Sequence, residues 1–498
     1  MKTPRIGRAG WFAVAVLALL LVFALAVLIV PNRLLQSDFL RSNLNESPDS
    51  GLLDYESASS RTPGTIHVKN LSFRDRDPKA EWSVELAEAD LTYSLADLLR
   101  RRLHVTRVTG HGLTFHARNR LTPAEAKGPR VRLLPPIAGF PDPPLLSPSP
   151  PKSAPTGKEW TVLVENLTVD SVREVWIDDY RFTGNAHLTG GFFLRPNLQA
   201  EIYPTELDSE TGVIRSGKEV LAEDVHARLA ARFPAWDPRR ISGHEVLRLV
   251  MGKAEAELQL PTAELVDRLI GEPAGTKLEK GSGRMNVKAS VERGVATGVI
   301  DFASSDLALR ILDVAMRGRF DARMALSGVH LETMGGGRLD GGRLNLTDAL
   351  LFDPDGTPHP WWGRIDFSRG EFRPTTEALF TTTATAHSRD SRPLLRIVGL
   401  KIPKWARNLL DLDEALNARG SVRVGHGLVE IRRMTARTGK LRIDGDYRAK
   451  GSSKSGTFLI DSGLLAVGVG IDGPKNELDV LGPRKWFRQH AGWEPAKD

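Results

Sequence analysis

The strongest hydrophobic pattern in the chain is an uninterrupted apolar run near its start. Residues 11–30 contain neither a charge nor a strong hydrogen-bonding side chain. A helix of that length covers ~30 Å, the thickness of a bilayer's hydrocarbon core. A cleaved signal peptide is the alternative, but its apolar core is shorter, about 7–15 residues, and ends in small residues at a cleavage site. This run ends Val30-Pro31-Asn32-Arg33, which favours an uncleaved transmembrane anchor.

The charges before this run predict how the chain is oriented. Lys2, Arg5 and Arg8 precede it without an acidic residue. Positively charged flanks stay in the cytoplasm, so residues 1–10 are expected there as a short tail. The sequence has no second long apolar run, so we expect residues 31–498 to lie on the far side of the membrane.

Beyond the anchor the hydrophobic pattern changes to short alternating stretches separated by Gly- and Asp-rich turns. Residues 64–75 alternate with period two, and the alternation slips at Asn70 as a bulge or a turn requires. Residues 162–170 repeat this pattern and slip at Asn166. Two such copies indicate an internal repeat, with chance similarity of two strands as the alternative.

Helical patterns are few and short. We expect helices over 94–101, 242–252, 261–271 and 403–418, whereas residues 306–316 fit a helix or a strand. These helices are too short to cover one face of a sheet with a dozen or more strands. The sheet must therefore curl on itself, pair with a second sheet, or leave an apolar face for a ligand.

Changes in composition divide the chain into segments. The prolines that crowd residues 129–155 exclude regular helix and sheet, which indicates a linker or a long surface excursion. We expect eight segments: a cytoplasmic tail (1–10), the anchor (11–30), a juxtamembrane linker (31–60), an N-terminal β unit (61–128), a Pro-rich linker (129–157), a central β-rich groove with short helices (158–400), a C-terminal helix with closing strands (401–475) and a tail (476–498).

Three stretches of the sequence are similar to one protein family. GTIHVKNLSFRD (64–75), ADLTYSLADLLRRRLHVTRV (89–108) and GLTFHAR (112–118) follow a single N-terminal anchor, and glycine-started strands from Gly420 close the chain. This arrangement resembles the AsmA-like family of bacterial envelope proteins. The resemblance implies an anchor in the bacterial inner membrane, a periplasmic ectodomain and a long, twisted, U-shaped β-groove lined with apolar side chains. Larger members of the family are thought to carry phospholipid between the inner and outer membranes.

Composition and charge exclude several classes of function. The net charge is +7, and removal of the three basic residues of the tail leaves 7 − 3 = +4 with both signs interspersed, which gives no reason to expect a nucleic-acid partner. The chain has no cysteine. This excludes disulfides, cysteine-based metal or iron–sulfur sites and a thiol nucleophile.

The candidate catalytic motifs favour structural interpretations. A type II membrane glycosyltransferase is the enzymatic alternative, with a D-x-D motif at Asp353 and Asp355, but Asp353-Pro-Asp-Gly356 is more simply a turn. Lys454-Ser-Gly456 resembles an element of penicillin-binding enzymes, yet its partner S-x-x-K falls among the prolines, and a hairpin turn explains it better. His104, His111 and His116 lie in predicted strands. We therefore expect no catalytic residue, metal or cofactor, and no enzymatic activity.

The predicted fold is mainly β: a transmembrane helix followed by an elongated, curled antiparallel sheet that forms a U-shaped groove, with a few short helices. Period two places apolar residues of the closing strands on one face, with Arg442 and Asp444 on the other. The candidates for the lipid groove are Val422, Val424, Leu441, Ile443, Phe458, Ile460, Val467, Val469 and Ile471.

The function expected from these observations is non-catalytic. It is phospholipid transport between membranes or envelope homeostasis, with the membrane, a phospholipid or other acyl lipid, and envelope proteins as partners. A scaffold that assists outer-membrane protein assembly, with a fully packed β interior, is the alternative.

Overall fold

The structure is a computed structural model of the whole chain. It describes residues 51–60, 62–76, 79–98, 100–146, 161–195, 198–238, 240–241, 243–263, 265–266, 276–311, 314–333, 335–373, 379–397, 414–439, 441–463, 465–473 and 475–495. The expected tail and anchor, residues 1–30, lie outside these ranges. Within the described ranges, no helix has the length and hydrophobicity that a membrane span requires.

The chain is mainly β, as expected, and divides into two units. Unit 1 comprises residues 1–219 and 227–250, and unit 2 comprises residues 220–226 and 251–498. The strand β9 (Glu219–Trp236) contributes residues to both.

Unit 1 is built from long strands. They are β1 (Gly51–Asp54), β2 (Ser57–Ser59), β3 (Thr65–Arg76), β4 (Ala80–Tyr93), β5 (Arg102–Asn119), β6 (Thr161–Ile177), β7 (Tyr180–Arg195) and β8 (Gln199–Ser216), with the short helices α3 (Leu95–Leu98), η1 (Glu125–Lys127), η2 (Pro129–Leu133) and η3 (Gly243–Leu249). The strands β3 to β8 pair in sequence order, and β1 and β2 both pair with β3. The end of the predicted juxtamembrane linker is therefore part of the sheet.

One pairing in unit 1 departs from the expected antiparallel sheet. β5 and β6 run parallel, because the Pro-rich segment crosses back between them. The described part of this segment is held against the strands: Arg118 donates hydrogen bonds to the carbonyls of Pro135 and Pro141, and Arg120 donates to that of Leu145. The predicted Pro-rich linker thus joins two neighbouring strands of one unit, as a surface excursion does.

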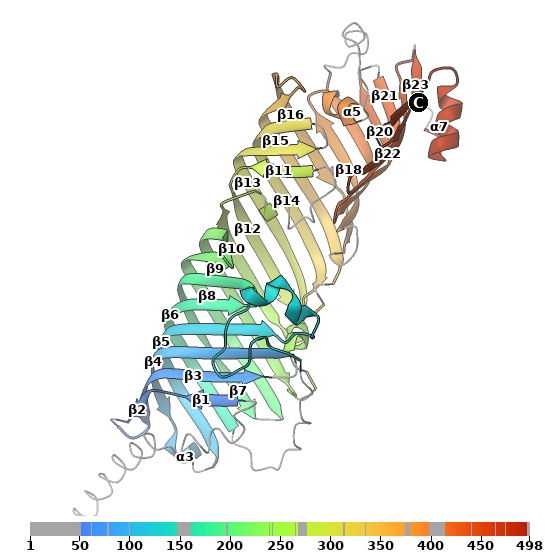
Figure 1. Cartoon of the computed structure of the whole chain (residues 1–498). Coiled ribbons are helices and arrows are strands. Elements are labelled where there is room, and N and C mark those ends of the chain that lie inside the picture. Colours follow the sequence, from blue (N-terminus) through green and yellow to red (C-terminus); the bar gives the residue numbers. More distant parts are fainter. Residues whose placement is uncertain are drawn as a thin grey trace, which may run out of the picture. The chain divides into compact units, whose positions relative to one another are not determined.

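One of the two phase slips that the sequence predicts, the one at Asn166, is a β-bulge. Asn70 has a φ of 48°, but the pairs on either side of it, Lys69 with Glu88 and Leu71 with Leu86, keep one register, so no bulge separates β3 from β4 there. The register of β6 against β7 shifts between Val164 and Leu167, around Asn166. Further bulges line up across unit 2, at Ser304/Leu307, Arg317/Arg319 and Leu346/Ala349. Because a bulge bends its strand and increases the local twist, this row of bulges bends the neighbouring strands that carry it; the strands are shown in Figure 1.

Unit 2 continues the same construction. Its strands are β10 (Met251–Leu260), β11 (Thr276–Lys280), β12 (Gly283–Glu292), β13 (Val295–Ile311), β14 (Val314–His330), β15 (Gly337–Phe352), β16 (Pro358–Phe367), β17 (Gly370–Phe372), β18 (Phe380–Ser388), β19 (Leu416–Gly425), β20 (Leu428–Thr438), β21 (Leu441–Lys450), β22 (Ser453–Asp461), β23 (Ala466–Asp472) and β24 (Lys475–Asp479). In the described part of unit 2 the strands pair antiparallel, and the helices α5 (Arg392–Ile397) and α7 (Pro483–Ala491) accompany them.

Several predicted boundaries in unit 2 need correction. The ambiguous residues 306–316 belong to the hairpin of β13 and β14. The helix predicted over 403–418 lies mostly outside the described residues, and its end is strand β19. The first of the glycine-started strands from Gly420 is divided between two strands, β19 and β20, with a turn at 426–427. The predicted tail from 476 contains most of β24 and the helix α7, which buries Trp486 and Phe487 against Leu459.

Candidate apolar binding face

A row of apolar side chains crosses unit 2 from strand to strand. Each member lies directly opposite the next in the pairing register, so all of them share one face of the sheet. We call this set the apolar row: Leu258, Met285, Phe302, Ala322, Leu344, Ile365, Ala386, Ala418, Ala436, Ile443, Ile460 and Val467.

The opposite face carries a matching polar row at the neighbouring positions. It consists of Glu257, Asn286, Asp301, Arg323, Arg343, Asp366, Thr385, Arg419, Thr435 and Asp444. Cross-strand ion pairs tie it together: Arg323 Nη1 lies 3.0 Å from Asp301 Oδ1, and Arg343 Nε lies 2.8 Å from Asp366 Oδ1. Hydrogen bonds from Arg364 and then Arg343 lower the pKa of Asp366, which keeps this carboxylate charged. The sheet therefore separates an apolar face from a charged one.

The apolar row has a half-buried part and a closed part. From β10 to β19 its members are half-buried except Phe302, which is buried. From β20 to β22 they are buried, and the row ends in the half-buried Val467. Leu395 of α5 packs into the cluster that closes this second part. We call the stretch from β10 to β19 the open half.

The predicted groove residues fall mainly in the closed part. Leu441, Ile443, Phe458, Ile460, Val469 and Ile471 belong to one buried cluster, and Val467 packs against it. Val422 and Val424 on β19 are half-buried. The period-two alternation placed these residues on one face correctly. However, six of the nine are packed core in this structure, and they do not line an open surface.

The opposite face of the closing strands is not solvated as the charges suggest. The carboxylate of Asp444 is 2 % exposed and accepts hydrogen bonds from Arg442 Nε at 2.7 Å and Thr435 Oγ1 at 2.8 Å. On β22 the row turns apolar at Leu459, which lies opposite Asp444 and packs beneath α7. Helix α7 therefore covers this face, which explains why alternation alone misjudged it.

The open half of the row was not predicted from the sequence. Its members come from strands such as β12 and β16, which the sequence does not assign to a face of the sheet. Many of these strands have a small or flexible residue at the row position, as with Ala322 and Met285, so no single segment is conspicuously hydrophobic. The signal appears when the strands are aligned in register, which the sequence alone does not supply.

Unit 1 has a shorter row of the same kind. Leu71, Leu86, Leu113, Val172 and Ala186 lie opposite one another across β3 to β7. The last three and Leu86 are buried in one cluster, and Leu71 packs against it. One-sided apolar faces thus recur in both units.

The candidate catalytic and metal sites have structural explanations. Asp353 to Gly356 form the turn between β15 and β16, as predicted, and Asp353 binds His359 and Arg396. Lys454 and Gly456 lie in strand β22, so the predicted hairpin turn is displaced to residues 451–452.

The three histidines singled out in the sequence have separate carboxylate partners. His104 lies beside Asp97 and Glu165, His111 beside Asp170 and His116 beside Glu174. In the part of the chain that the structure describes, no group of histidines and carboxylates has an arrangement that would hold a metal ion.

Comparisons with protein-family models, with curated proteins and with solved structures found no match to this chain.

Proposed function

We propose that this protein is a non-catalytic lipid-binding protein that holds acyl chains along the open half of the apolar row. The proposal includes anchorage in a bacterial inner membrane by residues 11–30, with residues 31–498 in the periplasm. It assigns the protein to phospholipid transport between membranes or to envelope homeostasis. The observation that supports it is a row of apolar residues that stays in register across twelve strands.

The physical properties of the open half suit an acyl chain. Its eight strands, at ~4.8 Å each, span roughly 30 Å along the row, which is comparable to the hydrocarbon thickness of a bilayer. Each methylene buried against such a surface contributes ~0.8 kcal/mol. No side chain of the row carries a hydrogen-bonding group. The row can therefore contact hydrocarbon, but it cannot bind a polar headgroup.

Site-specific photocrosslinking tests this proposal. A photoreactive amino acid at Leu344 lies on the apolar row, and one at the adjacent Asn345 lies on the opposite face. We expect lipid adducts, detected by mass spectrometry of the full chain from bacterial membranes, at position 344 and far fewer at position 345. Equal capture at both positions, or none at 344, contradicts the proposal.

A charged substitution in the apolar row, compared with the same substitution on the charged face, tests the proposal a second time. Leu344→Asp places a carboxylate among apolar neighbours, and a crosslinker at Met285 then reports the remaining lipid. We expect the adduct to fall several-fold, whereas Asn345→Asp on the charged face leaves it unchanged.

The scaffold function remains the second candidate because the closed part of the row is packed like an ordinary core. A folded protein that yields no lipid at Leu344 and copurifies with outer-membrane proteins supports the scaffold. Turnover of nucleotide sugars instead supports the glycosyltransferase. An exported phosphatase fused after Asp498 tests the orientation, and activity of that fusion is expected.

A further inference from the structure

The C-terminal end of unit 2 exposes an unusual concentration of large apolar side chains. Leu481 is 98 % exposed, Leu465 is 61 % exposed, and Leu478 and Val480 are 60 % exposed. Leu465 belongs to the turn before β23, whereas Val480 and Leu481 follow β24. The register, which pairs Gly468 with Asp479, brings these two connections to the same end of the strands. We call these four residues the apolar tip.

A cationic helix borders this tip. In α7, Trp486 and Phe487 face the sheet and are buried, and the helix contains no acidic residue. The close contact depends on glycine, because a Cβ at Gly468 would lie 2.6 Å from the ring of Trp486. With Trp486 and Phe487 facing the sheet, the exposed positions of the helix are Arg484, Lys485, Arg488, Gln489 and His490, of which the first three are cationic.

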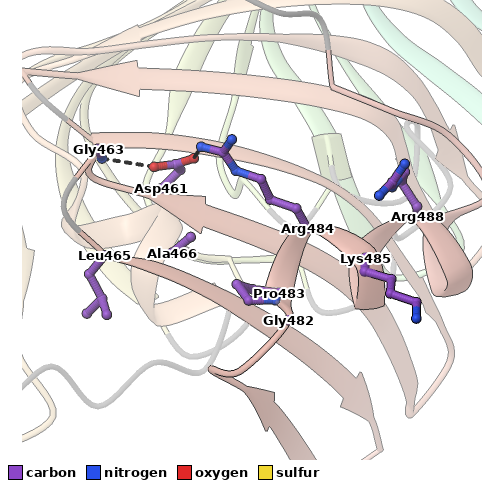
Figure 2. A pocket seen from close by; sticks show the side chains of 9 residues that line it. All are labelled: Asp461, Gly463, Leu465, Ala466, Gly482, Pro483, Arg484, Lys485 and Arg488. Atoms are coloured by element: carbon purple, nitrogen blue, oxygen red, sulfur yellow. Dashed lines mark hydrogen bonds and ion pairs between the residues drawn. The ribbon is translucent and has the colours of Figure 1, made fainter.

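Leu465 of the apolar tip and the three cations of α7 line one hollow. It has a volume of about 460 Å³, and its lining includes Leu465, Arg484, Lys485 and Arg488. Figure 2 shows Arg484 reaching across to Asp461, above the turn that carries Leu465, with the other two cations farther along the helix.

The cations retain capacity for an external anion. Arg484 Nη2 lies 2.5 Å from Asp461 Oδ2, and Arg488 Nη1 lies 2.7 Å from Glu494 Oε1. A guanidinium has five N–H donors, so one carboxylate leaves others available. Lys485 has no ion-pair partner among the residues described.

Surfaces that bind to a membrane interface combine exposed apolar side chains, such as leucine and valine, with neighbouring lysine and arginine. The apolar side chains enter the boundary between headgroups and acyl chains, and the cations contact anionic lipids. We propose that the apolar tip and α7 together dock this end of the protein onto the surface of a bilayer that contains anionic phospholipid. This inference is independent of the proposed function, because a protein that holds no acyl chain on the apolar row would still dock in this way.

Vesicle flotation with the full chain tests the docking surface. The protein is held in nanodiscs of neutral phosphatidylcholine and mixed with vesicles of phosphatidylcholine containing 30 mol% phosphatidylglycerol. We expect the nanodiscs to float with these vesicles and to bind pure phosphatidylcholine vesicles several-fold less. High salt should reduce the difference, because it screens the electrostatic part.

Two substitutions and two controls locate the contact. Lys485→Gln should weaken binding about fivefold, the contribution of one basic residue near an anionic surface. Leu481→Ser, at a side chain that is almost fully exposed, should also weaken it several-fold at unchanged stability. Lys288→Gln and Leu350→Ser remove an exposed lysine and an exposed leucine elsewhere in unit 2 and should change nothing.

Three outcomes overturn the proposal. They are equal binding to neutral and anionic vesicles, unchanged binding of both tip variants, and no vesicle binding by the folded wild type. In the last case, self-association or capture of an envelope protein through the tip would identify a protein surface as its occupant. Loss of lipid crosslinks at Leu344 with intact vesicle docking would contradict the proposed function alone.

Discussion

Arg118 and Glu81 form an ion pair buried beneath the Pro-rich segment. Arg118 Nη2 lies 2.8 Å from Glu81 Oε2, and each side chain is 1 % exposed. The same guanidinium binds the carbonyls of Pro135 and Pro141, so one side chain joins strand β5, strand β4 and the crossover. Because β5 and β6 are parallel, the chain between them has to return along the sheet, and the pair lies under this return.

Removal of one partner of this pair should destabilise unit 1. Glu81→Gln removes the buried carboxylate partner of Arg118 and leaves only the largely exposed Asp142 as a counterion, and loss of one partner of a buried pair costs about 3 kcal/mol or more. Denaturant unfolding of the full chain measures this loss. Glu85→Gln removes an exposed carboxylate from the same strand and should change the free energy of unfolding by less than about 0.5 kcal/mol. Equal effects of the two substitutions would show that the buried pair is not important.

A polar group in the closed part of the apolar row should reduce stability. Ile443 is fully buried, so Ile443→Thr loses packing and buries a hydroxyl, at a cost of about 1–3 kcal/mol in the free energy of unfolding. Arg448→Ser, at an exposed position of the same strand, is the control. A negligible change for Ile443→Thr would indicate that this part opens to solvent or lipid after all.

The bulge on β15 should tolerate glycine and reject a β-branched residue. Asp348 has a φ of 48°, in the left-handed region that L-residues adopt at a cost of about 1–2 kcal/mol. Asp348→Val should lower the melting temperature, and Asp348→Gly should keep or raise it. Thr347→Val, at the neighbouring exposed position, separates strain from the effect of valine itself. A neutral Asp348→Val would refute the bulge geometry.

His104 should make the stability of unit 1 depend on pH. Its Nδ1 lies 2.9 Å from Asp97 Oδ2 and its Nε2 lies 2.9 Å from Glu165 Oε1. The hydrogen bond with Asp97 raises the pKa of His104 in the folded protein above the unfolded value of about 6.5. The stabilisation is therefore fully present below about pH 6.5 and is lost as the pH rises through the folded-state pKa.

Unfolding curves between pH 5 and pH 9, a range chosen to bracket the unfolded-state value of about 6.5, measure this dependence. Relative to His104→Gln, the wild type should be more stable at the acid end, and the difference should shrink toward the alkaline end. His330→Gln removes an exposed histidine that has no carboxylate partner among the described residues, and it should leave the pH profile unchanged. A constant difference between wild type and His104→Gln across the range would rule out the linkage.

The local pattern of the sequence was sufficient for the strand architecture. Period-two alternation identified the strands and the faces of residues such as Ile443 and Phe458, because neighbouring side chains in a strand necessarily point to opposite sides. The slip at Asn166 was readable for the same reason, since a bulge leaves one residue out of phase. The Asp353 turn followed from the conformations that Pro, Asp and Gly favour.

The tertiary structure decided which faces are covered and which strands are neighbours. Asp444 is buried beside Arg442, and Leu459 lies under α7, because elements distant in sequence pack on those faces. The parallel pairing of β5 with β6 and the alignment of the apolar row depend on register between strands. Register arises from the sum of many cross-strand contacts, so the sequence of one strand does not specify which strand pairs with it or at which residues. The sequence by itself therefore determined where many of the strands and turns occur, whereas only the fold decided which apolar residues become core and which remain half-buried.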